Sequence, residues 1–225
     1  MVSLLPALLV LAAEFWEAKP YTKWTEQEVA RVLVDSPWAK EVHIRFEGDI
    51  EERLRAQQAA PPPPPANVAG LSQTRGGGSG PIGSMVGRKV QHIPAGATVR
   101  VRWESAKPLR EAIAATKKAP VTPEARHYEL VIDKIPPYME TREPAYLRDV
   151  LLKITELKWD KEEPVRASDV AISANEDGLV VRLFFPRRAD AKAGSVAELH
   201  TRVGVSRVKC AFRVKPMTVA GRLEL

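Results

Sequence analysis

The chain has 225 residues, of which 44% are hydrophobic, and it carries a formal net charge of +6. This length suits one β domain or two small ones, and the apolar fraction is large enough to build a core. The single cysteine, Cys210, excludes an internal disulfide and any metal site built on paired cysteines. Lysine and arginine are spread among 28 acidic residues, which favours a solvated basic surface over a nucleic-acid-binding arm.

Residues 1–13 carry no charge and include an apolar run from Leu4 to Ala13. The run has the length of a signal-peptide core and about half the length of a membrane-spanning helix. Val10 and Ala12 are small residues at the spacing that precedes signal cleavage. We therefore expect residues 1–13 to be a signal peptide and the protein to be periplasmic or secreted. Because no Lys or Arg precedes the run, an uncleaved apolar segment packed on the domain is the alternative.

Residues 14–56 are expected to form an N-terminal helix and strand. Thr25 and Glu28 have the spacing of a capping box, in which each side chain satisfies a free amide at a helix start. Pro37 disfavours helix before it, so this helix ends by Asp35 or Ser36. Residues 42–46 alternate apolar and polar side chains and are typical of a strand with one wet face.

The same segment holds three tryptophans and one tyrosine within a short stretch. These rings have two interpretations: they dock the N-terminal helix onto the sheet, or they form a patch that binds a partner or stacks on a polysaccharide. They are Trp16, Tyr21, Trp24 and Trp38.

Residues 57–88 have the composition of a disordered, proline-rich linker or exposed loop. Five prolines fill positions 61–65, and a glycine-serine run follows at 76–80. The first part favours stiff polyproline II structure and the second part a flexible chain. Residues 51–55 precede it as a possible short helix.

Residues 89–225 show the two-residue period of β-strands. Outward arginines separate Val99, Val101 and Trp103, and residues 128–133 repeat the pattern. A helix is expected at 108–118, a helical turn at 146–150 and a hairpin turn at 175–178. Further strands are expected at residues 151–159, 170–173, 179–185, 197–203, 207–214 and 219–225.

These seven or eight strands predict a mainly β protein. We expect an antiparallel β-sandwich, immunoglobulin-like in the loose sense, with one or two short helices and a long Pro/Gly-rich disordered loop. Residues 42–46 and 98–103 share one polarity pattern and are expected to pair. That pairing would join 14–56 to the sandwich at 89–225 as one domain. A helical N-terminal module on a tether is the alternative.

No motif for catalysis, a metal or a cofactor stands out. The four histidines lack metal-site spacing, and Cys210 alternates with apolar residues as a buried, inert thiol does. We predict no metal and no cofactor, and the sequence identifies no catalytic residue. If the chain is a hydrolase with a site assembled from distant residues, Glu104 and Ser105 beside Trp103 are the first candidates.

Short motifs along the chain resemble a group of uncharacterised exported proteins of acidobacteria. The resemblance implies export and a single domain, and it implies no activity. The motifs lie at residues 19–25, 36–40, 101–112, 185–187 and 212–225.

Together these features favour an exported, non-enzymatic binding or assembly protein of the cell envelope, with an envelope protein or polysaccharide as its partner. An envelope hydrolase is one alternative. The other is a basic binder of an anionic polymer or nucleic acid, and export argues against nucleic acid as the partner. If residues 219–225 lie at a sheet edge, they offer a strand for pairing with another protein.

Overall fold

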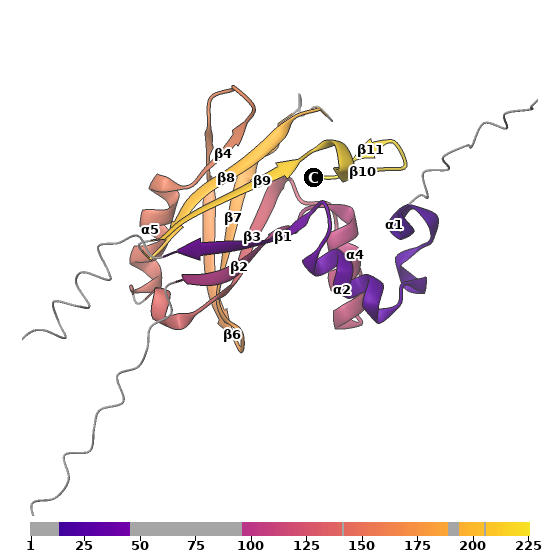
Figure 1. The fold of residues 1–225 in the computed structure, drawn as a ribbon, viewed down its shortest axis with the longest axis horizontal. Coiled ribbons are helices and arrows are strands. Elements are labelled where there is room, and N and C mark those ends of the chain that lie inside the picture. Colours follow the sequence, from indigo (N-terminus) through magenta and orange to yellow (C-terminus); the bar gives the residue numbers. More distant parts are fainter. Residues whose placement is uncertain (1–13, 46–95, 141, 189–193, 205) are drawn as a thin grey trace, which may run out of the picture. The chain divides into compact units, whose positions relative to one another are not determined.

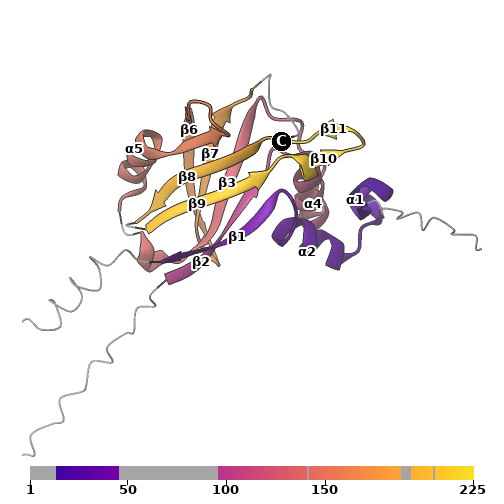
Figure 2. The same cartoon turned by 45° about the horizontal axis from the view of Figure 1, so that its top comes forward.

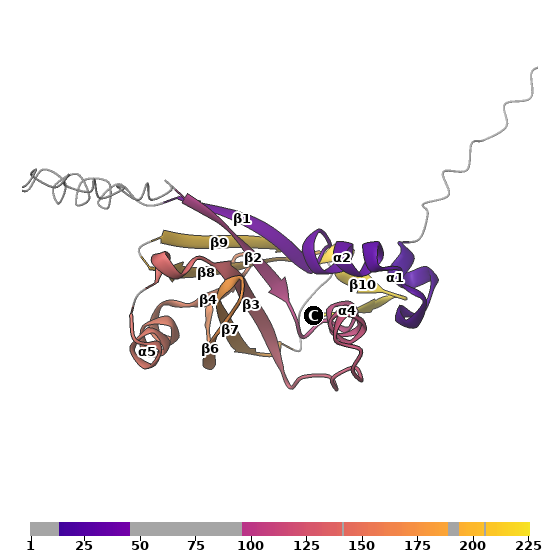
Figure 3. The same cartoon turned by 90° about the horizontal axis from the view of Figure 1, so that it is seen from below.

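Two antiparallel sheets form the body of the protein, as Figures 1 and 3 show. The computed structural model describes residues 14–45, 96–140, 142–188, 194–204 and 206–225. The expected signal peptide at 1–13, the expected linker at 57–88 and the possible helix at 51–55 lie outside these residues. Residues 14–45 group with 96–225 into one unit.

The first sheet has five strands in the order β1-β2-β3-β7-β6. Its strands are β1 (Ala39–Arg45), β2 (Gly96–Trp103), β3 (His127–Ile135), β6 (Asp169–Asn175) and β7 (Gly178–Pro186). β1 pairs with β2, with Val42 opposite Val99, so the expected pairing of these two segments is confirmed.

The second sheet has four strands in the order β5-β4-β8-β9. Its strands are β4 (Glu156–Trp159), β5 (Val165–Arg166), β8 (Val196–Val203) and β9 (Ser206–Arg213). The two sheets pack face to face, and the predicted antiparallel β-sandwich is confirmed. It is immunoglobulin-like only in the loose sense of two packed antiparallel sheets.

Trp103 lies at the centre of the core between the sheets. Its ring is fully buried and makes edge contacts with Tyr128, Trp159 and Phe212, at centroid distances of 5.3, 5.9 and 5.5 Å. Tyr128 belongs to the first sheet, whereas Trp159 and Phe212 belong to the second. Such edge contacts add about 0.5–1.5 kcal/mol each beyond burial, so one side chain joins both sheets.

Helices gather at the two ends of the sheets, and all three ribbon views agree on this (Figure 2). α1 (Phe15–Ala18), η1 (Tyr21–Lys23), α2 (Glu26–Val34) and α4 (Lys107–Lys117) lie at one end. α5 (Pro144–Ile154) lies at the other end, and η2 (Pro137–Met139) precedes it in the chain. No helix among the described residues is long and apolar enough to span a bilayer.

Several local predictions are confirmed. Thr25 and Glu28 form the capping box of α2, which ends at Val34. α4 starts with a proline in its first turn, as expected. Residues 175–178 form the β6–β7 hairpin turn, in which Gly178 has a φ of +127°.

The strand expected at residues 151–159 is wrong in its first half. α5 extends to Ile154, and only residues 156–159 form strand β4. Pro144 begins the helix, and Leu147 and Leu151 lie one turn apart on its buried face. A short apolar run fits a helix or a strand equally well, so its period did not decide between them.

The expected final strand at residues 219–225 is also wrong. The chain forms η3 (Lys215–Met217) and then a small hairpin of β10 (Thr218–Val219) and β11 (Arg222–Leu223). The indole N–H of Trp38 donates to the Glu224 carbonyl at 2.7 Å, and the Leu225 side chain is buried. The C-terminal segment is therefore docked onto the domain and is not a free sheet edge.

Glu140 links the segment after β3 to the turn between β8 and β9 through hydrogen bonds. Its carboxylate accepts hydrogen bonds from the backbone N–H groups of Arg142 and Gly204, both at 3.0 Å, and from the Arg142 guanidinium. Burial alone would raise the pKa of Glu140, but these hydrogen bonds outweigh it and lower the pKa. Gly204 has a φ of +59°, and a Cβ there would lie 2.0 Å from the Met139 carbonyl oxygen.

Replacing this carboxylate should weaken the fold in a pH-dependent way. Glu140→Gln is expected to lower the free energy of unfolding at pH 7 by about 1–3 kcal/mol, because buried N–H donors lose a charged acceptor. A lowered folded-state pKa gives stability that is present above the usual pKa and is lost as the pH falls through the folded one. In urea titrations, the difference in free energy of unfolding between the unsubstituted protein and Glu140→Gln should therefore shrink below roughly pH 4. Glu163→Gln, at an exposed position, is the control. A difference in free energy of unfolding between the unsubstituted protein and Glu140→Gln that is constant with pH would contradict the role given to the Glu140 carboxylate.

Candidate functional site

The outward face of the five-stranded sheet, beneath α4, is the candidate functional site. Along β2 the side chains of Val99, Val101 and Trp103 are buried in the core, so those of Arg100 and Arg102 point to the opposite face. The register between strands brings further charged residues from β3 and β7 to the same face. They are Glu129 and Asp133 of β3 and Arg182 of β7.

Glu104 is the centre of the charge network on this face. One carboxylate oxygen lies 2.6 Å from Arg102 Nη2 and the other lies 2.7 Å from Arg182 Nη1. Arg102 also contacts Asp133 at 2.9 Å, and Arg182 contacts Glu129 at 2.5 Å. The Glu104 side chain is only 6% exposed. Two arginines from different strands therefore hold one buried carboxylate in a fixed position.

Burial affects the two ends of this network differently. Burial raises the pKa of Asp133, and the positive charges of Arg102 and Arg100 offset the increase only in part. Burial also opposes the charge of Arg182, but the attraction and hydrogen bonds of Glu104 and Glu129 outweigh it and raise the pKa of that guanidinium. Among the described atoms, Asp133 Oδ1 and Arg102 Nε are buried without a hydrogen-bond partner. Burying these charged groups therefore costs desolvation free energy that the contacts within the network do not fully offset.

Two cavities of about 360 and 340 Å³ adjoin the network. Both are lined by Glu104 and Arg182 from the sheet side and by Ile113 and Lys117 from α4. Ile113 and Lys117 are one helical turn apart, so a single face of α4 borders both cavities. The larger cavity continues along residues 119–125, and the smaller one continues to Asp133, Ser173 and Asn175.

Arg110 connects α4 to the turn that precedes it and to the segment that follows it. Its Nε donates to the Ser105 carbonyl at 3.2 Å, and its Nη1 donates to the Thr122 carbonyl at 2.6 Å. The helix is also held by its buried residues Leu109 and Ala112, which lie on one face. These contacts keep the wall of the cavities in place.

The two residues predicted for a hydrolase lie at this site, but a hydrogen bond holds one of them and ion pairs hold the other. Ser105 is 2% exposed, and its hydroxyl oxygen accepts the backbone N–H of Glu129 at 3.1 Å. Both oxygens of Glu104 contact arginines. Among the described residues that line the two cavities, none is a histidine or a cysteine. The arrangement presents charges that ion pairs hold in fixed positions.

No family model, curated protein or solved structure matches the chain. The resemblance to exported acidobacterial proteins therefore stays a prediction from sequence.

The four aromatic residues of the N-terminal segment are distributed unevenly. Trp16 and Trp38 are buried and meet edge to face, with 5.5 Å between ring centroids. Trp24 is 9% exposed and borders an apolar cavity of about 420 Å³ between α2 and α4. Tyr21 is partly exposed. Three of the four rings thus pack the N-terminal helices onto the domain, and a partner-binding role for the set stays a prediction.

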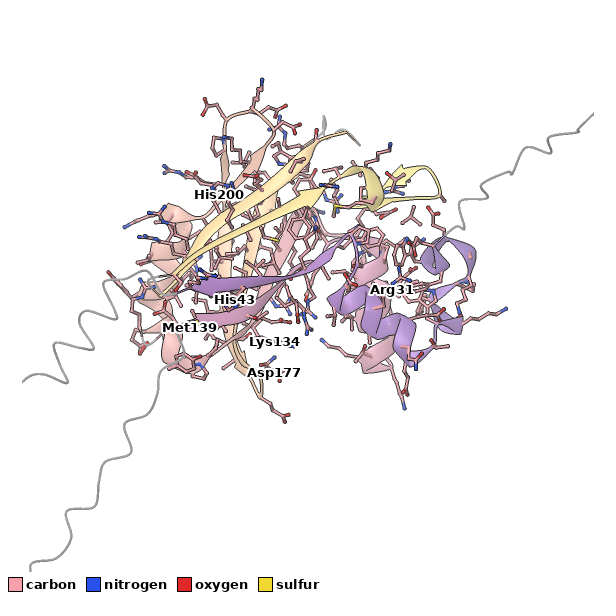
Figure 4. The ribbon with its side chains drawn as sticks, viewed as in Figure 1. Arg31, His43, Lys134, Met139, Asp177 and His200 are labelled. Carbon is pink, nitrogen blue, oxygen red and sulfur yellow. The ribbon has the colours of Figure 1, made fainter. Side chains whose placement is uncertain are left out.

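The remaining sequence candidates occupy ordinary positions. Cys210 is buried, and burial raises the pKa of its thiol to about 12, which keeps it protonated and unreactive. His43 lies on the outward face of β1, and His200 lies on the outward face of β8; Figure 4 labels both residues. Within the described ranges, no cluster of three or more His, Cys, Asp or Glu side chains is placed to hold a metal ion.

Sequence reasoning found Glu104 but missed its partners. Arg102 and Asp133 were visible as outward residues of two predicted strands, and the opposite signs of their charges were the available signal. Arg182 was not linked to them, because β3 and β7 are about 50 residues apart in sequence and their pairing is non-local.

Proposed function

We propose that the protein is an exported, non-enzymatic binding protein of the cell envelope, whose partner is an envelope protein or polysaccharide. One observation carries the proposal: the charged groups beside the two cavities are fixed by ion pairs, and the candidate nucleophile Ser105 is committed to a backbone hydrogen bond. Preorganised charges that face a cavity suit recognition, because little ordering entropy remains to be lost on binding.

The export half of the proposal rests on sequence. Residues 1–13 carry no charge and have the apolar length and small-residue spacing of a cleaved signal peptide. The domain contains no internal disulfide, since the chain has one cysteine and that cysteine is buried.

The mature N-terminus tests export directly. Protein recovered from its native host is expected to begin at Ala13 or Glu14, because Val10 and Ala12, or Leu11 and Ala13, would precede the cut. N-terminal sequencing by mass spectrometry, with whole-cell and envelope fractions compared, gives the answer. Recovery of intact Met1 from a cytoplasmic fraction would contradict export.

A serine-reactive fluorophosphonate probe separates binding from hydrolysis. We expect no labelling of the folded protein, because the Ser105 hydroxyl is shielded and no base activates it. Ser105→Ala serves as the matched variant, and a known serine hydrolase confirms that the probe works. Stoichiometric labelling that disappears in Ser105→Ala would overturn the non-enzymatic proposal in favour of the hydrolase alternative.

A further inference from the structure

The outward face of the four-stranded sheet is strongly basic. Alternation along its strands puts apolar side chains into the core and charged side chains on the surface. Two acidic residues, Glu156 and Glu198, lie on this face with six basic ones. The basic residues are Lys158, Arg166, Arg202, Arg207, Lys209 and Arg213. We call this set the basic face.

The basic face concentrates the charge of the chain. Its six basic and two acidic residues give an excess of four positive charges, whereas the whole chain has a formal charge of +6. The face is also accessible: the side chains of Lys209 and Arg166 are 62% and 69% exposed. An excess of one sign on one face raises the local concentration of oppositely charged partners.

The acidic residues on this face are already engaged. Glu198 lies 3.0 Å from both His200 Nε2 and Lys209 Nζ, and Glu156 lies 3.7 Å from Arg166. The register places Arg202 on β8 directly opposite Arg207 on β9, which brings two cations side by side on this face.

The chemistry of the face selects the kind of anion. Among the outward residues described on β4, β5, β8 and β9, His200 has the only ring, and Figure 4 labels it on the sheet. Proteins that bind single-stranded nucleic acid use aromatic rings on which the bases stack. Along β9 the outward cations Arg207 and Lys209 lie about 7 Å apart, and Arg213 lies about 13 Å beyond Lys209, with Ala211 between them. This pattern fits a linear polymer recognised through its repeated anionic groups.

We infer that the basic face is a binding surface for an anionic polysaccharide. The choice of a polysaccharide over nucleic acid rests on the proposed envelope function, whereas the preference for a polyanion rests on the charges alone. The surface is separate from the cavities beneath α4, which border the other sheet.

Binding to heparin, a sulfated polysaccharide, tests the surface. The mature chain should bind immobilised heparin with an affinity that falls steeply as salt rises, because each neutralised anion releases counterions. The triple variant Arg207→Gln, Lys209→Gln, Arg213→Gln should lose most of this binding, and the slope of log affinity against log salt should fall by about three. Circular dichroism and thermal melts would establish that the variant is folded.

The matched control removes three exposed cations from outside the four-stranded sheet. Lys23→Gln, Lys118→Gln, Arg126→Gln changes the net charge equally and should leave heparin binding nearly intact. Equal losses in the two triple variants would show that only net charge matters and would overturn the basic face as a site. Salt-insensitive or absent heparin binding would also overturn it, without affecting the N-terminal and serine-probe tests of the proposed function.

Duplex DNA of matched charge is the comparison ligand. We expect it to bind no tighter than heparin at equal salt. Tighter binding to DNA, lost in the basic-face variant but kept in the control, would overturn the polysaccharide assignment in favour of nucleic acid. That result would be read together with the location of the mature N-terminus, which tests export separately.

Discussion

The alternation of side chains along β2 is the constraint on which both the core and the candidate site depend. Trp103 points inward and joins the two sheets through its ring contacts. Its neighbour Arg102 therefore points outward, and Glu104, in the turn that follows β2, contacts both Arg102 and Arg182 of β7. Because a slip of one residue would exchange the two faces, the burial of Trp103 also fixes the register that assembles the charge network. Packing energy from the core thus positions polar groups that contribute little stability themselves.

The two sheets use their outer faces differently. On the five-stranded sheet, α4 partly covers the charges, and positive and negative groups neutralise each other in a buried network beside two cavities. On the four-stranded sheet, the charges are exposed and mainly positive. Buried ion pairs are roughly neutral for stability, since desolvation offsets attraction, but they hold groups in defined positions. The first face therefore suits a small ligand or a protein side chain, and the second suits an extended anion.

Local features were predictable because their physics is local. The Thr25–Glu28 capping box, the proline at the start of α4 and the Gly178 turn each depend on residues within one or two turns. Only one turn of the helix at 144–154 was predicted, at 146–150, because leucines at 147 and 151 fit both a helix and a strand. The hydrogen bond from Trp38 to Glu224, which docks the C-terminal segment, joins positions 186 residues apart, and no local pattern encodes it. The contact between Glu104 and Arg182, 78 residues apart, was missed for the same reason.

The central claim is that Glu104, held between two arginines, organises the outward face of the five-stranded sheet. Its most direct test compares the free energies of unfolding of Glu104→Gln and Glu129→Gln by urea denaturation at neutral pH. Glu104→Gln should cost about 1–3 kcal/mol, because it removes the shared counter-ion of Arg102, which is 15% exposed, and of Arg182, which is 36% exposed. Glu129→Gln should cost under about 1 kcal/mol, since that carboxylate is 22% exposed and, among the described residues, forms an ion pair with Arg182. Equal costs for the two variants, or a smaller cost for Glu104→Gln, would contradict the account.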